Sequence, residues 1–396
     1  MHTSPLSLPL TMLIVFGSAK LMSELFERFR MPGIVGEIVA GVIIGPSLLG
    51  WVTPNDALRA FSDLGVLFLL FDIGLDAKIS DFMKVGLIAT GVAALGELLP
   101  FVALWGLLLS WGATQNEALF AAVSLVATSV GISAYVLSAR GFLGEVAGKI
   151  ILAAAVIDDV LGLIMLAVVS SIVRGRINFL EIALTAGLAA GFTIVAAIWG
   201  TKLANRLLPR FRSRLQADEA QFHLAVVLLF ALAVLASSAG VAAIVGAFLA
   251  GLALADSADS RLRNLTRGVN ELFMPFFLMG IGLNFSLAVF RSRSAILLAL
   301  AIFAVAILTK LAGCGLAAAQ FGWRTALRVG SGMVPRGEVA MIAAQLGLSM
   351  TVLSETTYSM IVFVVVATAL ATPLLLRYAF AGVTPAPAAH MPDASK

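Results

Sequence analysis

Apolar stretches of about 20 residues, each long enough to cross the hydrocarbon core of a membrane, recur along almost the whole chain. Of its 396 residues, 60% are hydrophobic and 12% are charged, whereas a soluble domain carries about 25% charged residues. Such a composition cannot supply a water-facing surface. The short alternating segments typical of a membrane β-barrel are absent from the sequence. We therefore predict an all-α, multi-pass membrane protein.

The hydropathy pattern predicts about thirteen transmembrane helices, because lipid offers no partner to unpaired backbone groups of any other structure. The predicted spans are 6–26, 33–51, 58–75, 82–110, 116–138, 146–173, 179–203, 221–238, 241–256, 269–285, 294–319, 325–348 and 356–380. The segment 381–396, which contains a Pro-Ala run, is predicted to be disordered.

Basic residues set the predicted orientation of these spans. Loops after odd-numbered spans hold most of the lysines and arginines, including Arg210, Arg212 and Arg214, and loops after even-numbered spans hold few. Positive loops stay in the cytoplasm, so the N-terminus is expected outside and the C-terminus inside. The same loops account for the net charge of +4 without a nucleic-acid partner. The one cysteine, Cys314, lies in an apolar segment, so neither a disulfide nor a thiol metal site is predicted.

Two pairs of segments indicate an internal repeat. Residues 37–45 align with 243–251 at an offset of 206, and residues 73–76 align with 281–284 at an offset of 208. The offsets carry span 2 onto span 9 and span 3 onto span 10, a shift of seven spans. Because seven is an odd number of crossings, the second repeat is inverted in the membrane relative to the first. We therefore predict two inverted repeats, spans 1–6 and 8–13, joined by span 7. Transporters built this way bind their substrate near the midplane.

Two adjacent carboxylates, Asp158 and Asp159, lie near the middle of the predicted span 146–173. A charge at the bilayer centre costs several kcal/mol, so these residues are candidates for an ion or proton site. Successive helix residues diverge by about 100°, so the two side chains cannot serve one identical role. The alternative, a pair that snorkels at a helix end, fits their central position less well.

Lys310 is the only lysine deep in the second half of the sequence. A buried ammonium without a partner is costly, so we expect Lys310 to pair with an aspartate across the bundle. Two roles stay open for it. Lys310 can remain protonated and steady the fold, or it can carry a second proton when the pair opens.

Helix-breaking residues occur at matching places in the two halves, within 127–133 and 332–338. Interrupted helices free carbonyl oxygens and expose dipole ends beside a bound ion, and hard cations prefer oxygen ligands. The residues predicted to line the two breaks are Thr128, Ser129, Gly131 and Pro335. We interpret Arg336 and Glu338 as an internally compensated pair that belongs to the scaffold.

Asp72, Glu338 and Arg336 are secondary candidates for the site. Asp72 lies in the last turns of span 58–75, near the predicted inner entrance, and shares a helix face with Asp76. Glu37 and Glu97 lie in or near spans. A hydrogen-bonded scaffold role explains these two glutamates at least as well as a transport role.

The chain resembles bacterial Na+/H+ antiporters of the NapA type, in the second monovalent cation/proton antiporter superfamily, through four motifs. They are Val-Ile-Asp158-Asp159-Val-Leu-Gly-Leu, Thr128-Ser129-Val130-Gly131, Lys310 in an Ile-Leu-x-Lys-x-x-Gly setting, and Gly332-Met-x-Pro-Arg-Gly-Glu338-Val. The resemblance implies that Asp159 binds Na+ or a proton and that Asp158 pairs with Lys310. It covers essentially the whole chain.

The resemblance also implies an NhaA/NapA-like fold with two broken, crossing helices and a homodimeric assembly. A dimerisation scaffold would comprise residues 1–80 and 218–290, and a mobile core would comprise residues 81–176 and 291–380. Residues 177–217 would form a linker helix and a cytoplasmic loop. The core would move like an elevator against the scaffold.

The expected activity is secondary antiport of Na+, with Li+ as a competitor, for H+ across the bacterial inner membrane, with net charge movement. A K+/H+ antiporter of the same superfamily is the alternative. A cation channel fits inverted broken helices less well, and an intramembrane aspartyl protease would need two aspartates from separate helices. No enzyme activity, no cofactor and no soluble nucleotide-binding domain are expected, and the partners expected are lipid and a second copy of the chain.

Overall fold

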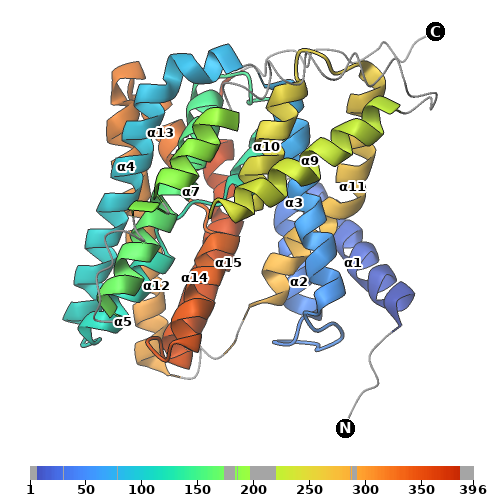
Figure 1. The fold of residues 1–396 in the computed structure, drawn as a ribbon. Coiled ribbons are helices and arrows are strands. Elements are labelled where there is room, and N and C mark those ends of the chain that lie inside the picture. The colour runs from blue at the N-terminus through green and yellow to red at the C-terminus, as the bar shows by residue number, and fades with distance from the viewer. Residues whose placement is uncertain are drawn as a thin grey trace.

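The computed structural model describes residues 7–29, 31–77, 79–173, 183–184, 186–196, 220–285, 287 and 292–383, and every regular element within them is a helix (Figure 1). The first half contains α1 (Leu8–Arg28), α2 (Gly33–Ile44), α3 (Asp56–Asp76), α4 (Ile79–Ser110), α5 (Gln115–Ser124), α6 (Val130–Ala139) and α7 (Val146–Val173). The second half contains α9 (Ala220–Ser238), α10 (Ala243–Leu254), α11 (Ser260–Leu283), α12 (Arg293–Ala318), the short η2 (Ala319–Phe321), α13 (Trp323–Gly332), α14 (Glu338–Ser349) and α15 (Glu355–Ala379). The all-α prediction is confirmed.

Each predicted span except the seventh coincides with one helix or with a broken pair of helices. Within the described residues, six helices are long and apolar enough to cross a membrane on their own. Of the seventh span, 179–203, the structure describes residues 183–184 and 186–196, and all of these are helical. The predicted disorder at 384–396 lies outside the described residues, whereas residues 381–383 form a turn after α15. In Figure 1, α1 begins at the lower face and α15 ends at the upper face, as an odd number of crossings requires.

Two helix boundaries differ from the prediction. The second span was predicted to reach residue 51, but α2 ends at Ile44, because Pro46 disfavours helical backbone at Gly45. The tenth span was predicted to begin at residue 269, but α11 begins at Ser260. Its first turns carry arginines that lower the hydropathy, and the Asp259 side chain caps them by accepting from the Leu262 N–H at 2.8 Å.

The helices form two groups that pack mainly within themselves (Figure 1). One group contains α1–α3 and α9–α11, and the other contains α4–α7 and α12–α15. The groups meet where α3 packs on α6 and where α15 packs on α2 and α11. The molecule therefore has an internal seam of few helix contacts between two larger bundles.

Close helix crossings occur in duplicate and reveal the internal repeat. Gly282 of α11 lies against the Ile38 carbonyl of α2, and Gly74 of α3 lies against the Phe248 carbonyl of α10. A Cβ at either glycine would overlap backbone atoms, so only glycine allows these approaches. Ile38 and Phe248 are 210 residues apart, and Gly74 and Gly282 are 208 residues apart. The same contact is thus built once by each repeat.

These helix contacts correct the predicted alignment of residues 37–45 with residues 243–251. Both α2 and α10 have 12 residues, and they begin 210 residues apart, at Gly33 and Ala243. The predicted offset of 206 was therefore wrong by four residues, which is about one helical turn. A one-turn slip leaves the same helix face apolar, so the sequence pattern fitted both registers almost equally well.

Candidate ion site

The two broken helices are interrupted at equivalent places. α5 ends at Ser124 and α6 begins at Val130, and α13 ends at Gly332 and α14 begins at Glu338. Both boundaries repeat at an offset of 208 residues. The break after α13 follows from Pro335, which lacks an N–H and disfavours helical backbone at the preceding residue. The breaks thus lie at 125–129 and 333–337.

The two breaks hold each other through hydrogen bonds. The Ser129 N–H donates to the Pro335 carbonyl at 2.8 Å, and the Thr128 hydroxyl donates to the Met333 carbonyl at 3.3 Å. The Ser133 hydroxyl donates to the Gly332 carbonyl. The carbonyls at the end of α13, which were predicted to be free for a cation, are therefore already accepting from protein donors.

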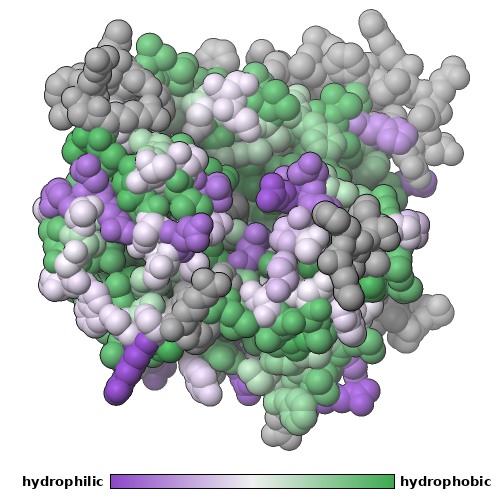
Figure 2. Space-filling view, turned by 90° about the horizontal axis from the view of Figure 1, so that it is seen from below, coloured by the Kyte–Doolittle hydropathy of each residue, from purple (hydrophilic) through white to green (hydrophobic). Residues whose placement is uncertain are grey.

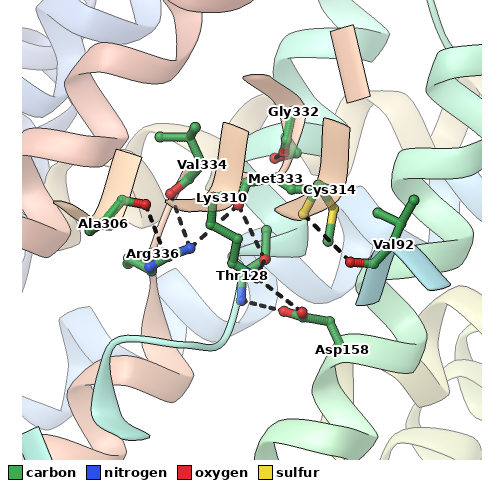
Figure 3. Close-up of polar contacts among 11 residues, drawn as sticks. Val92, Thr128, Asp158, Ala306, Lys310, Cys314, Gly332, Met333, Val334 and Arg336 are labelled. Atoms are coloured by element: carbon green, nitrogen blue, oxygen red, sulfur yellow. Dashed lines mark hydrogen bonds and ion pairs between the residues drawn. The ribbon is translucent and has the colours of Figure 1, made fainter. Parts of the chain in front are cut away.

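Where the two broken helices cross, Asp158, Lys310 and Thr128 form a closed triangle of hydrogen bonds (Figure 3). The Lys310 Nζ donates to Asp158 Oδ1 at 3.1 Å and to Thr128 Oγ1 at 2.8 Å, and the Thr128 N–H donates to Asp158 Oδ2 at 2.6 Å. Asp158 and Lys310 are fully buried. One carboxylate thus compensates an ammonium from α12 and caps the break in the first repeat.

Asp159 is also buried, with 1% of its surface exposed. It follows Asp158 on α7, so its side chain points about 100° further round the helix. The triangle uses both oxygens of Asp158 and none of Asp159. The adjacent carboxylates therefore occupy different environments, as the sequence predicted.

Arg336 stabilises the second break from inside the protein. Its guanidinium, which is fully buried, donates to the carbonyls of Met333 at 3.4 Å, Val334 at 3.2 Å and Ala306 at 3.5 Å (Figure 3). A cation there opposes the negative dipole end of α13. The predicted pairing of Arg336 with Glu338 stays a prediction, because the Glu338 side chain lies outside the described part of the chain.

Equivalent positions of the two repeats carry different chemistry. At the offset of 208, Thr128 corresponds to Arg336, and the Arg336 N–H donates to the Thr368 hydroxyl of α15 at 3.2 Å. Thr368 lies 210 residues after Asp158. The break is thus capped by a carboxylate in the first repeat and by a hydroxyl in the second. Sequence reasoning missed Thr368, because the offsets of 206 and 208 lead from Asp158 to Val364 and Val366 instead.

Gly131 is not a break residue, contrary to the prediction. It lies in the first turn of α6, at the seam between the helix groups. A Cβ there would lie 2.8 Å from Val66 Cγ2 and 3.1 Å from Phe277 Cζ, both of the other helix group. Gly131 therefore permits close packing across the seam.

Three other acidic residues, Glu37, Asp76 and Asp72, lie in different settings. Glu37 forms an ion pair with Lys20 at 3.1 Å, which fits a scaffold role. Asp76 pairs with Arg263 and Arg267 of α11, whereas Asp72, one turn earlier in α3, is buried and forms none of these pairs. A transport role for Asp72 stays a prediction.

Two pockets lie on the seam, toward opposite ends of the bundle. A pocket of about 560 Å³ lies between α3, α11, α14 and α15 and reaches Gly337 in the second break. Figure 2 views the face on this side, where hydrophilic residues surround a central depression. A pocket of about 490 Å³ lies between α1, α2 and α6 and extends no nearer the first break than Tyr135. The larger pocket therefore comes closer to the crossing.

Comparisons with known proteins agree with this architecture. A family model described as "Sodium/hydrogen exchanger, transmembrane" matches residues 12–380. The Na(+)/H(+)-K(+) antiporter GerN of Bacillus cereus is 32% identical over 373 residues, covering 93% of this chain and 95% of that protein. The Na(+)/H(+) antiporter of Enterococcus hirae is 32% identical over 361 residues, covering 90% and 94%. The solved structure of the sodium proton antiporter MjNhaP1 from Methanocaldococcus jannaschii has a similar fold, with a TM-score of 0.70 at 16% identity over 96% of this chain and 97% of that one.

Removal of the buried ammonium should destabilise the protein more than removal of the whole ion pair. We expect Lys310→Met to cost about 3–5 kcal/mol, because it leaves the Asp158 carboxylate buried without its counter-ion. Adding Asp158→Asn should restore most of that loss, since the asparagine oxygen can still accept from the Thr128 N–H. The measurement is the thermal unfolding midpoint in detergent.

The matched control is Arg28→Met, which removes an exposed ion pair with Glu24 and should change the midpoint little. A double variant no more stable than Lys310→Met would contradict the idea that the two charges compensate each other.

Proposed function

The chain belongs to the sodium/hydrogen exchanger family, and we propose that it exchanges Na+ for protons across the cytoplasmic membrane of a bacterium. It is a multi-pass membrane transporter rather than an enzyme. The observation that carries the proposal is a buried carboxylate, Asp159, beside an aspartate already compensated by Lys310, at the crossing of two broken helices. Ionisable groups at such a crossing are typical of ion and proton pathways.

The chemistry of the exchange follows from exclusive occupancy of the site. A carboxylate at Asp159 attracts either Na+ or a proton, and binding of one removes the charge that attracts the other. Asp158 can contribute an oxygen to the cation when its contact with Lys310 loosens. Alternate opening of the site to the two sides then couples the two fluxes without any covalent step.

The seam between the helix groups suggests how the site opens. We propose that α1–α3 and α9–α11 form a dimerisation scaffold and that α4–α7 and α12–α15 carry the site as a mobile core. The few contacts across the seam and the close packing at Gly131 support movement as rigid bodies. The larger pocket would be the outer entrance and the smaller one the closed inner entrance. The dimer can be tested by light scattering of the purified protein, and a monomeric mass would contradict it.

The charges at the crossing favour transport that moves net charge. Asp158, Asp159 and Glu97 are opposed by Lys310 and Arg336, all of them buried, so the fully ionised cluster carries one negative charge. One Na+ neutralises that charge, whereas two protons leave a positive charge. A membrane potential would then drive exchange with about 2.3 kcal/mol per charge per 100 mV.

Potassium/proton exchange is the second candidate function. The relative from Bacillus cereus is named a Na(+)/H(+)-K(+) antiporter, and carboxylate oxygens can bind either monovalent cation. Exchange measured with Na+, K+ and Li+ in turn distinguishes these possibilities.

Loss of the Asp159 charge should abolish exchange. In liposomes with an imposed pH gradient, we expect the intact protein to move protons when Na+ is added and Asp159→Asn to show no such response. The control is Glu24→Gln, an exposed carboxylate that should exchange normally. Substantial exchange by a folded Asp159→Asn protein would place the cation site elsewhere.

The predicted orientation can be tested with single cysteines in a Cys314→Ala background, since Cys314 is the only native cysteine. A membrane-impermeant thiol reagent added outside cells should label Gln345→Cys in the larger pocket and should not label Ala139→Cys in the smaller one. Labelling of only Ala139→Cys from outside would reverse the proposed orientation.

A further inference from the structure

Glu97 is a buried carboxyl group in the transport core with no described hydrogen bond. It lies on α4, which packs against α7 and α12, and only 2% of its surface is exposed. Neither of its side-chain oxygens has a hydrogen-bond partner among the described residues. Its Oε1 lies 3.1 Å from the position that a Cβ on Gly162 would take, one turn along α7 from the aspartates. Glu97 is therefore beside the ion site and outside the triangle.

The backbone of α4 beside Glu97 lies close to Lys310. A Cβ on Gly96, the residue before Glu97, would lie 3.5 Å from Lys310 Nζ. The ammonium has three donors, and its described bonds to Asp158 and Thr128 use two of them. Lys310 therefore has a donor left for α4, where Glu97 is the next side chain in the sequence.

The burial of Glu97 limits the charge that it can carry. An ionised carboxylate without a partner in a water-free interior is strongly unfavourable, whereas a protonated carboxylic acid is far less so. While Lys310 pairs with Asp158, the protonated form of Glu97 fits the structure. If Lys310 turns toward α4, its ammonium can compensate an ionised Glu97.

We propose that Glu97 carries a second proton, which it releases when Lys310 leaves Asp158 to pair with it. The inference rests on the proposed Na+/H+ exchange and names a second group that carries the protons. In the proton-loaded site, Asp159 and Glu97 are protonated and Lys310 pairs with Asp158. In the sodium-loaded site, Na+ is held at Asp159 with help from Asp158, and the Lys310 ammonium pairs with the Glu97 carboxylate.

The exchange balances in atoms and in charge. Two protons from one side load Asp159 and Glu97, and both return to water when one Na+ enters from the other side. Lys310 and Arg336 keep their protons throughout. One net positive charge therefore crosses with the protons in each cycle, and Lys310 acts as a mobile counter-ion instead of a proton carrier.

The titratable groups around Glu97 come from each element that packs on α4. α12 contributes Lys310 and the thiol of Cys314, and α7 contributes Asp158 and Asp159. From α5, the described ionisable side chain is Glu117, which accepts from Ser354 and Thr357 at the far end of that helix. Arg336, from the second break, donates to the Ala306 carbonyl of α12. Of these groups, Lys310 is the cation whose charged atom lies within 3.5 Å of the position that a Cβ on Gly96 of α4 would take.

The test is the number of protons exchanged per sodium ion by the full-length protein in liposomes. Opposing Na+ and pH gradients are imposed, and the clamped membrane potential that stops net flux gives the ratio. We expect two protons per sodium for the intact protein and for Glu97→Asp, which keeps a carboxyl group. Glu97→Gln, which mimics the protonated form, should exchange one proton per sodium and lose its response to potential.

The outcomes separate this inference from the proposed function. Absence of any exchange by the intact protein would overturn both. A ratio of one for the intact protein would leave Na+/H+ exchange in place and overturn the role of Glu97. A ratio of two for both the intact protein and Glu97→Gln would overturn only the inference.

A second measurement decides the case in which Glu97→Gln does not transport. Infrared difference spectra of the folded protein report the carbonyl stretch of protonated carboxylic acids. Without Na+, the intact protein should show a component that Na+ removes and that Glu97→Gln lacks, and Glu97→Asp should retain it at a shifted frequency. A spectrum unchanged by Glu97→Gln would contradict the proposal.

Discussion

The ion pair between Lys310 and Asp158 is the interaction on which the rest of the core depends. Two helices break in the middle of the bundle, where lipid and packed side chains offer no water to unpaired backbone groups. Asp158 accepts from the Thr128 N–H, and Lys310 donates to the Thr128 hydroxyl, so the pair closes the first break from two directions. The two buried charges are costly to bury, but they supply the hydrogen bonds that stabilise the break. Loosening the ion pair would therefore change both the charge distribution of the site and the hydrogen bonding of its backbone.

The two repeats share an architecture but differ in chemistry, so the two sides of the site carry different groups. In the second repeat, Arg336 and the hydroxyls of Thr128 and Ser133 donate to the carbonyls at and just after the end of α13. The negative end of that helix is therefore neutralised by fixed protein donors. The first repeat keeps the carboxylates. An ion arriving at the crossing would meet Asp159 and Asp158 rather than a ring of free carbonyls.

Periodic and local features of the fold could be predicted from the sequence. Long apolar spans, the central aspartates, the buried lysine and the breaks at Thr128 and Pro335 all leave local signals, and the structure has the corresponding elements in place. The offset between the repeats was wrong by one turn, because apolar helices match almost equally well in either register. The position of Gly131 at the seam was also missed, since a glycine next to a break looks the same as one within it.

The role of Glu97 could not have been predicted in this way. It is a single acid on an apolar helix, and its neighbours Gly162 and Lys310 are distant in the sequence. Only the packing of α4 on α7 and α12 brings them together. The hydroxyl donors to the carbonyls of Gly332 and Met333 could not be predicted for the same reason, because Thr128 and Ser133 belong to the other repeat.

The central claim is that sodium and protons compete for one site centred on Asp159. Calorimetry of Na+ binding to the purified protein, repeated in buffers of different ionisation enthalpy, counts the protons released per bound sodium ion. The account predicts that protons are released on binding, that the apparent Kd for Na+ rises as pH falls, and that Asp159→Asn loses both effects. Sodium binding that releases no protons and has the same affinity at every pH would contradict it.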